Sequence, residues 1–310
     1  MTDIFSTPPF NTEYVKQHTA NDLPTQLATH KYLHYFQHAL GAIDGSHIPI
    51  KAPAQYWDAC HNRKGFVSQN CPFVCSFDFF FTYALTGWEG SASDARVYHE
   101  AVGIDLEDPL VIPPGSYLLA DGGYPLRGTF NPLSQHALSS CRMGKSIISK
   151  SNVIAVLSIL TSNFYYFFSP NSKEELFNLQ HTKARNVIEH IFGALKRRFC
   201  ILSFGCEYLM DVQPKILSAL SAIHNFIHIH NPQVEANEAQ ADLDDDNDDL
   251  HRNAGDYMVQ GIGYVFVDEV EDGDVAARCN TIAQAMWDDY RVAWEMAGHN
   301  ANAYFQDNNT

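Results

Sequence analysis

A carboxylate interrupts an apolar, strand-like run near the start of the chain, in the stretch HALGAIDGSHIPIK. Apolar residues lead up to Asp44, and apolar and polar residues alternate after it, which is the pattern of a half-buried β-strand. A charged side chain in such a strand is costly unless something compensates it. The pattern therefore predicts a strand over 38–51 with a special role for Asp44, although Asp-Gly is also a common hairpin turn.

Three further acids stand in comparable settings. Asp94 begins a predicted helix after GSAS, Asp121 follows the apolar run YLLA, and Glu189 lies on a helix that is otherwise apolar and basic. Carboxylates brought together repel one another, and a hard divalent cation such as Mg²⁺ or Mn²⁺ relieves that repulsion. Taken singly, Asp94 could be an N-cap, Asp121 could open the Gly-Gly turn, and Glu189 could pair with Arg185. Spacing alone allows a carboxylate metal site without establishing one.

The hydrophobic patterns predict an α/β fold. Strands are expected at 71–78, at 80–88 and before Asp121. Helices are expected from Ser93 or Asp94, and in HTKARNVIEHIFGALKRRFCIL, VQPKILSALSAIHNFIHIH and DVAARCNTIAQAMWDDYRVAWEMA. Two of the acids follow strands, where an open α/β sheet places its binding crevice.

The net charge of −16 is concentrated at one end of the chain. Residues 1–234 carry 17 Lys and Arg against 18 Asp and Glu, whereas residues 235–310 carry 3 against 18. The acidic stretch is expected to be solvated and flexible. The nearly neutral body remains compatible with a nucleic-acid partner.

Several classes of protein are disfavoured by simple patterns. The seven cysteines form no CxxC pair, which argues against a zinc ribbon. The first residues lack the basic and apolar regions of a secretory signal, so an intracellular protein with reduced thiols is expected. The apolar run NVIAVLSILTSNFYYFF is at the short limit for a membrane span, and a membrane anchor is the least favoured interpretation of it.

Six motifs occur in a fixed order: GAIDGSHIPI, NRKGFVSQN, LTGWEGSASDARV, LADGGYPL, KEELFNLQHTKARNVIEHIFGALKRRFCIL and AIHNFI. Together they resemble the DDE transposases of the PIF/Harbinger superfamily and the Harbinger transposase-derived nucleases. The resemblance covers about residues 35–230. It implies an α/β, RNase H-like mixed sheet flanked by helices, with extra C-terminal helices.

The resemblance also implies the chemistry. Asp44, Asp121 and Glu189 would be the catalytic acids, and Asp94 a further ligand, of two Mg²⁺ or Mn²⁺ ions that support hydrolysis of DNA phosphodiesters. Nucleic-acid binding is expected of five basic residues, Arg63, Lys64, Lys196, Arg197 and Arg198, which could hold backbone phosphates. Cations at the end of a helix could equally favour its dipole. His47 could approach the metal, and a hydrogen bond within a turn is the favoured alternative.

Two features depart from the family pattern. Residues 141–169 replace a polar, basic stretch that contains the fifth strand in the family, and they could be a translated intron or a genuine insert. Sequencing of transcripts across this region would decide between the two. Only about 40 residues precede Asp44, so specific DNA binding could come from a separate Myb-like partner, which the family commonly uses.

The expected organisation is an arm (1–36), an RNase H-like DDE nuclease domain (37–232, with 141–169 atypical), an acidic segment (233–275), a helix (276–298) and a tail (299–310). The leading interpretation is a nuclear, metal-dependent DNA endonuclease of transposase origin, cytoplasmic if it lacks its partner. The alternative is an inactive transposase-derived scaffold that binds DNA or protein. A small-molecule phosphatase is less favoured, because DGGYP lacks the Lys or Ser of a phosphate-cradling loop.

Overall fold

The computed structural model describes residues 2–19, 34–103, 106–121, 123–124, 130–132, 170, 172–205, 207–231 and 275–296. The chain divides into two compact units: residues 1–132 with 183–246, and residues 133–182 with 247–310. The segment 141–169, nearly all of the acidic segment and the C-terminal tail lie outside the described residues. None of the described helices is long and apolar enough to cross a membrane.

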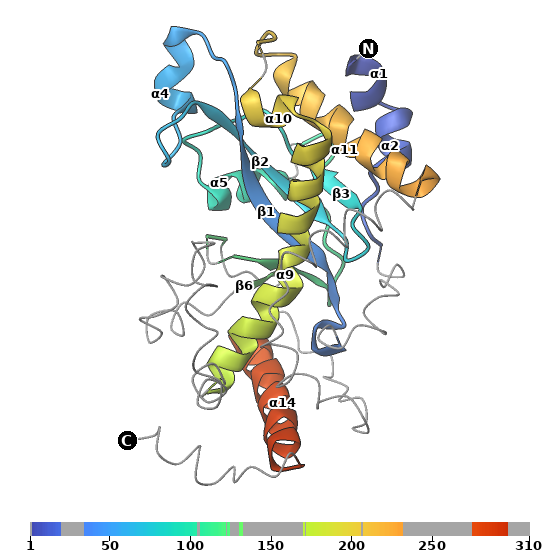
Figure 1. The fold of residues 1–310 in the computed structure, drawn as a ribbon, viewed down its shortest axis with the longest axis vertical. Helices are drawn as coiled ribbons and strands as arrows, with labels where there is room; N and C mark the ends of the chain where they lie inside the picture. The colour runs from blue at the N-terminus through green and yellow to red at the C-terminus, as the bar shows by residue number, and fades with distance from the viewer. Residues whose placement is uncertain are drawn as a thin grey trace, which may run out of the picture. The chain divides into compact units, whose positions relative to one another are not determined.

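A six-stranded mixed sheet forms the centre of the first unit (Figure 1). The strand order is β3-β2-β1-β5-β6, and β4 pairs separately with β2. Strand β2 pairs in antiparallel orientation with β1, β3 and β4, whereas β5 pairs in parallel orientation with β1 and β6. The strands are β1 (Ala39–Pro49), β2 (Ser68–Cys75), β3 (Phe81–Ala84), β4 (Trp88–Glu89), β5 (Tyr117–Ala120) and β6 (Phe130–Pro132).

The helices of the first unit come mainly from the two ends of its sequence. The chain contains α1 (Thr2–Ser6), α2 (Phe10–Tyr14), α4 (Trp57–Cys60), α5 (Asp94–Ala101), α9 (Lys173–Arg198), α10 (Ile201–Phe204) and α11 (Gln213–His230), with short 3₁₀ turns η1 (His34–Phe36) and η2 (Ala54–Tyr56). The first part of the expected arm, residues 2–19, therefore contains two short helices, which pack along α11 (Figure 1). The Asn11 side chain donates to the Ser218 hydroxyl across this contact.

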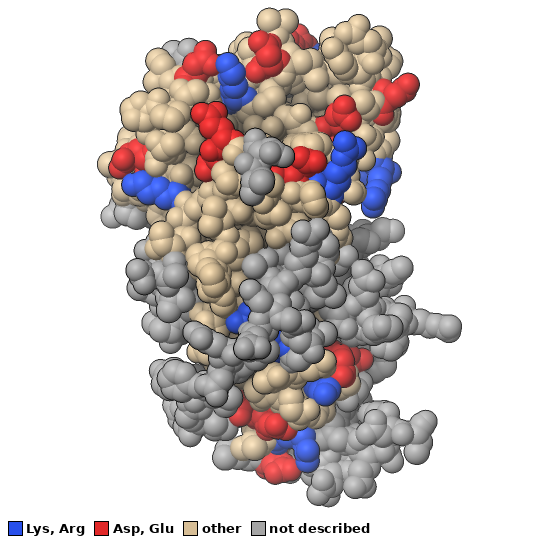
Figure 2. All heavy atoms as spheres, turned by 180° about the vertical axis from the view of Figure 1, so that it is seen from behind, with Lys and Arg blue, Asp and Glu red and all other residues tan. Residues whose placement is uncertain are grey.

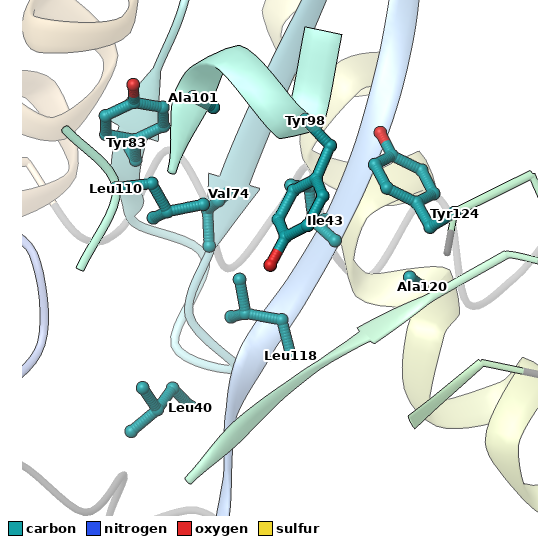
Figure 3. Packing of buried hydrophobic residues seen from close by; sticks show 10 residues of the cluster. All are labelled: Leu40, Ile43, Val74, Tyr83, Tyr98, Ala101, Leu110, Leu118, Ala120 and Tyr124. Carbon is teal, nitrogen blue, oxygen red and sulfur yellow. The ribbon is translucent and has the colours of Figure 1, made fainter. Parts of the chain in front are cut away.

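Side-chain alternation along β1 and β2 separates the two faces of the sheet. Ile43 is paired with Val74 and packs on the α5 side, in a core that includes Tyr98 and Leu118 (Figure 3). On the other face, Phe73 lies 5.4 Å from the ring centre of Phe192 on α9. Helices therefore cover both faces, as an α/β sheet requires.

Strand bounds differ from the sequence-based expectation at two places. The predicted strand 71–78 is β2, shifted to Ser68–Cys75, because the chain turns at once through Ser76 and Phe79, whose φ is 61°. The predicted strand 80–88 is divided into β3 and β4. The division falls at Gly87, which has a φ of +95° and lies against the Pro214 side chain.

Buried Asn225 protects the outer edge of β3. Its amide nitrogen donates to the carbonyl oxygens of Phe81 and Tyr14, at 2.7 Å each, and its amide oxygen accepts from the Phe81 nitrogen. The AIHNFI motif therefore serves packing: it ties α11 and the N-terminal arm to a strand edge that would otherwise be unpaired.

The second unit contains α14 (Val275–Met296) and the first residues of α9. One face of α14 is buried, through Ile282, Ala283, Met286, Tyr290 and Ala293. Lys173 Nζ lies 3.4 Å from Gln284 Oε1. A helix is thus present where the amphipathic pattern near the C-terminus predicts one.

Candidate active site

Asp44 lies within β1 and not in a hairpin turn. It is paired with Phe73, and the β1–β2 ladder continues from it through Pro49. The parallel pairing of β1 with β5, by contrast, extends only as far as Ala42 and Leu119. Asp44 therefore stands just beyond the point where these two strands part. Asp121 directly follows the last residue of β5, on the same side of the sheet's end.

Glu189 and Arg185 approach Asp44 from α9. Arg185 Nη1 lies 3.2 Å from Asp44 Oδ2, and Arg185 Nη2 lies 2.5 Å from Glu189 Oε1. The i,i+4 pair foreseen for Glu189 is therefore present, and the same guanidinium also reaches the strand acid. Ile188 and Ile191, on the same part of the helix, are fully buried and fix its position on the sheet.

The electrostatics show that the aspartates converge. Burial raises the pKa of Asp44 to about 6; Arg185 opposes the rise, and Asp121 and Asp94 add to it. The buried Tyr124, seen beside Ala120 in Figure 3, has a pKa well above its usual value, first through burial and then through Asp94, Asp44 and Asp121. Three carboxylates thus act on one small region, which is the condition that favours a cation.

Asp94 reaches this region from the opposite face of β1. Ser93 caps α5, so Asp94 is the first helical residue, and its side chain is available for other contacts. A Cβ on Gly45 would lie 2.3 Å from Asp94 Oδ1, and a Cβ on Gly123 would lie 3.6 Å from Asp94 Oδ2. The Asp94 carboxylate therefore lies close both to Gly45, which follows Asp44 in β1, and to Gly123, two residues after Asp121.

Asn70, which was not predicted as a site residue, holds the Asp94 side chain in place. Its amide nitrogen donates to Asp94 Oδ1 at 2.9 Å and to the Ala92 carbonyl oxygen at 3.0 Å. These two acceptors fix the orientation of the amide, since the flipped group would place oxygen against oxygen. Asn70 is 1% exposed, and its Oδ1 has no hydrogen-bond partner among the described residues. The signal available in the sequence was that polar Asn70 directly precedes the apolar run CPFVC of the same predicted strand region.

Gly45→Ala should lower the free energy of unfolding by about 1–3 kcal/mol, as overpacking typically does. The added methyl would overlap Asp94 Oδ1 at 2.3 Å and press on Asn70 Oδ1 at 2.9 Å. Urea denaturation measures the loss. In an Asp94→Ala background the same substitution should cost less, because one of the two obstacles is gone. Equal losses in both backgrounds would show that Asp94 is not what limits this position.

Basic side chains gather near the acids. The pKa of His47 is lowered by burial, raised in part by Asp94, and lowered further by Lys64, Arg63 and Lys196. The pKa of Lys196 is lowered by burial and by Lys64 and raised by Asp44. The loop carrying Arg63 and Lys64 and the end of α9 therefore lie within electrostatic reach of the acidic group.

Asn62 organises the loop that bears Arg63 and Lys64. Its side-chain oxygen accepts from the Lys64 nitrogen at 2.9 Å and from the Phe66 nitrogen at 3.3 Å. Its amide nitrogen donates to Ser68 Oγ, which also lies 3.2 Å from Nδ1 of His47. His47 is therefore held within the β-structure, and the two exposed cations project from a loop with a defined backbone.

The last two predicted phosphate-binding residues differ from each other. Arg198 Nη1 lies 3.1 Å from Nδ1 of the buried His224, so this guanidinium is directed at α11. Arg197 is exposed. Over the face in Figure 2, acidic and basic side chains are interspersed. Their electrostatic interaction with the acidic group or with His47 beside it therefore distinguishes Arg63, Lys64 and Lys196.

The residues fit a divalent cation by donor chemistry. Carboxylate oxygens are the preferred ligands of Mg²⁺ and Mn²⁺, and the guanidinium of Arg185 already balances two of them. Among the described residues, however, no three acidic, histidine or cysteine side chains are close enough to enclose an ion as they stand. Binding would require Arg185 to yield and the acids to close.

The comparisons with known proteins agree with this geometry. The family model for the DDE superfamily endonucleases matches residues 43–225, and the chain belongs to this family. The mixed sheet flanked by helices is the RNase H-like α/β arrangement predicted for it. No solved structure gives a significant match.

Relatives from three mammals share the name "Putative nuclease HARBI1". The protein of Rattus norvegicus is 33% identical over 85 residues, which are 27% of this chain and 24% of the relative. Those of Homo sapiens and Bos taurus are each 25% identical over 198 residues, which are 63% of this chain and 47% of the relative. The chain thus spans about half the length, or less, of these relatives. The resemblance to Harbinger transposase-derived nucleases is confirmed.

Proposed function

We propose that the protein is a metal-dependent DNA endonuclease of transposase origin that hydrolyses phosphodiester bonds with two divalent ions. Asp44, Asp121 and Glu189 would be the catalytic ligands, and Asp94 a further ligand. The observation that supports the proposal is that Arg185 joins Asp44 and Glu189 where β1 and β5 part, and that the charges of Asp121 and Asp94 act on Asp44 there. Membership of an endonuclease family makes DNA the leading substrate.

Each element of the chain has a distinct task in this proposal. Bound ions would activate water and stabilise the leaving oxygen. Asp44 and Glu189 would hold their oxygens toward a common point from strand and helix, and Asn70 would keep Asp94 oriented. Arg63, Lys64 and Lys196 would bind phosphates beside the reacting one, which positions DNA without reading its sequence. His47 would support the loop through Ser68.

Mg²⁺ or Mn²⁺ should raise the melting temperature of the protein, because a ligand that binds only the folded state stabilises it by mass action. At an ion concentration 100 times the dissociation constant, the gain is about 2.7 kcal/mol. Thermal denaturation across an ion titration measures the shift. The triple variant Asp44→Ala, Asp121→Ala, Glu189→Ala should lose it.

A matched control removes acids elsewhere in the same unit. Asp3 and Glu207 are exposed and pair with Lys215 and Lys51. Their alanine variants should retain the full metal-dependent shift. Equal shifts in the wild type and the triple variant would exclude these three acids as the metal site.

The alternative is a transposase-derived scaffold that binds DNA or protein without cutting. The ion pairs of Arg185 favour this alternative, because they give both Asp44 and Glu189 a cationic partner without any metal. The two functions separate in one assay. A folded wild type that binds DNA but never nicks it, with either metal, would support the scaffold.

Sequence recognition would come from outside the described core. A separate Myb-like DNA-binding protein is the partner we propose, and the nucleus the site of action. The direct evidence would be that the protein co-purifies with such a partner on target DNA, and that it is not retained on the same DNA when the chain is expressed alone.

A further inference from the structure

Arg185 joins the two acids that come from different elements of the site. It is the cation on both Asp44 and Glu189, and its side chain is only 11% exposed. Its Nε is buried and has no hydrogen-bond partner among the described residues. A guanidinium remains charged at any ordinary pH, so this arrangement places a permanent positive charge between a strand acid and a helix acid.

The charge of Arg185 compensates a local excess of negative charge. Asp121 and Asp94 both act against ionisation of Asp44, and Arg185 is the charged side chain that acts in its favour. The arginine thus does for Asp44 what a bound cation would do. Its nitrogen atoms take the oxygens Asp44 Oδ2 and Glu189 Oε1, which are also the oxygens that an ion between these residues would need.

A divalent ion and the guanidinium therefore compete for the same oxygens. Once the ion holds them, Arg185 becomes a largely buried cation without its two anions, and such a charge is costly unless it finds another partner. The substrate brings one, since a phosphate diester accepts two parallel hydrogen bonds from a guanidinium.

We propose that Arg185 is an exchangeable counter-ion, which pairs with Asp44 and Glu189 in the metal-free protein and turns to the substrate phosphate when metal binds. The proposal rests on the proposed nuclease function. It makes Arg185 a residue that contacts substrate, and it couples two binding events. Metal strengthens DNA binding by releasing the guanidinium, and by linkage DNA must strengthen metal binding by the same factor.

The test compares Arg185→Gln with Lys215→Gln. Both variants remove one cation from a carboxylate, but Lys215 pairs with exposed Asp3, away from the acidic site. Mn²⁺ is titrated by thermal shift, without DNA. Arg185→Gln should move the midpoint to a concentration roughly tenfold lower or more, because a competing unit charge near the ligands is gone. Lys215→Gln should leave the midpoint in place.

The second measurement is the coupling. Fluorescence anisotropy with a short labelled DNA duplex gives affinity with and without Ca²⁺, another ion that takes oxygen ligands. Intact DNA is verified on a gel. The wild type and Lys215→Gln should bind DNA more tightly with Ca²⁺, and Arg185→Gln should lose most of that gain. An unchanged or higher Mn²⁺ midpoint in Arg185→Gln, or an undiminished gain, would overturn the exchange.

Arg185→Lys covers the case in which the glutamine variant does not fold. Lysine keeps the charge but lacks the planar fork that reaches both carboxylates, so its Mn²⁺ midpoint should lie below that of the wild type. An identical midpoint would count against the exchange. A wild type without any metal shift, together with variants that also lack one, would overturn the proposed function and the exchange with it. If only the Arg185 variants show a metal-dependent rise in melting temperature, that result directly supports competition between the guanidinium and the metal ion.

Discussion

Replacing Glu189 with Gln should reduce DNA cleavage by about 10²–10³-fold or more, the scale of loss for one electrostatic contact to the reacting group. The amide keeps the size of the side chain but cannot neutralise a metal ion. DNA binding should persist or tighten, because one carboxylate fewer repels phosphate. Nicking of supercoiled DNA with Mg²⁺ or Mn²⁺, and gel-shift binding at fixed salt, should be measured on one folded preparation.

Glu207→Gln is the matched control for this result. Glu207 is exposed and pairs with Lys51, so its variant should cut at the wild-type rate. Loss of the Glu189–Arg185 pair should not unfold the protein, since the Glu189 side chain is 55% exposed and such a pair contributes about 0.3–0.5 kcal/mol. Cleavage that survives Glu189→Gln would remove this residue from the catalytic set.

Acidification should destabilise the protein through His224, by about 2 kcal/mol between pH 7 and pH 5. The side chain is 1% exposed, with Nε2 at 3.3 Å from the Phe79 carbonyl oxygen. That oxygen can only accept, so Nε2 carries the proton and Nδ1 accepts from Arg198. Burial, then Arg198 and the neighbouring His228, lower the pKa of His224 to about 3, although the hydrogen bond to the Phe79 carbonyl opposes the shift. The unfolded chain takes up the proton near pH 6.5, so stability falls as pH decreases.

The comparison with His224→Gln isolates this contribution. Asp44 acts in the opposite direction: its folded-state pKa of about 6 lies above the unfolded value of 3.8, so its effect is destabilising at neutral pH and disappears on acidification. Over the same interval Asp44 contributes roughly 1 kcal/mol of the opposite sign, which is common to both proteins. Urea denaturation at the two pH values should therefore show a smaller loss in the variant. Parallel losses would mean that His224 is protonated in the folded protein.

The sequence was most informative where local pattern and chemistry coincide. Asp44 follows an apolar run, and Glu189 lies on an amphipathic helix, so both elements could be predicted, and the structure brings both side chains to Arg185. The hairpin alternative for Asp44 was wrong. An Asp-Gly pair forms a hairpin turn when the partner strand begins directly after it. Here the pairing of β1 with β2 continues from Asp44 to Pro49, so the chain stays extended past Gly45.

Tertiary contacts account for what the sequence could not show. Asn70 and Asp94 are 24 residues apart, and no periodicity connects a strand amide with a helix carboxylate. The second contact of Arg185 spans 141 residues, whereas its helical pair with Glu189 follows from a spacing of four. Arg198 was predicted to bind phosphate, but its guanidinium is directed at His224 on α11, and this contact depends on how α9 and α11 pack. Short-range patterns therefore drew attention to Asp44 and Glu189, and the resemblance to the family assigned their role, whereas the residues that support them depend on long-range packing.

The anchoring of α9 has a consequence for how this gene can change. Glu189 is held by side chains that follow Lys183 in the chain, namely Ile188, Ile191, Phe192 and Leu195, all buried in the first unit. Helical register is transmitted along the backbone, so these contacts, such as that of Phe192 with Phe73 on β2, fix the rotation of Glu189 independently of residues 133–182. Exon gain, loss or alternative splicing that is confined to residues 133–182 can therefore alter this joining segment and leave the geometry of the helix acid unchanged.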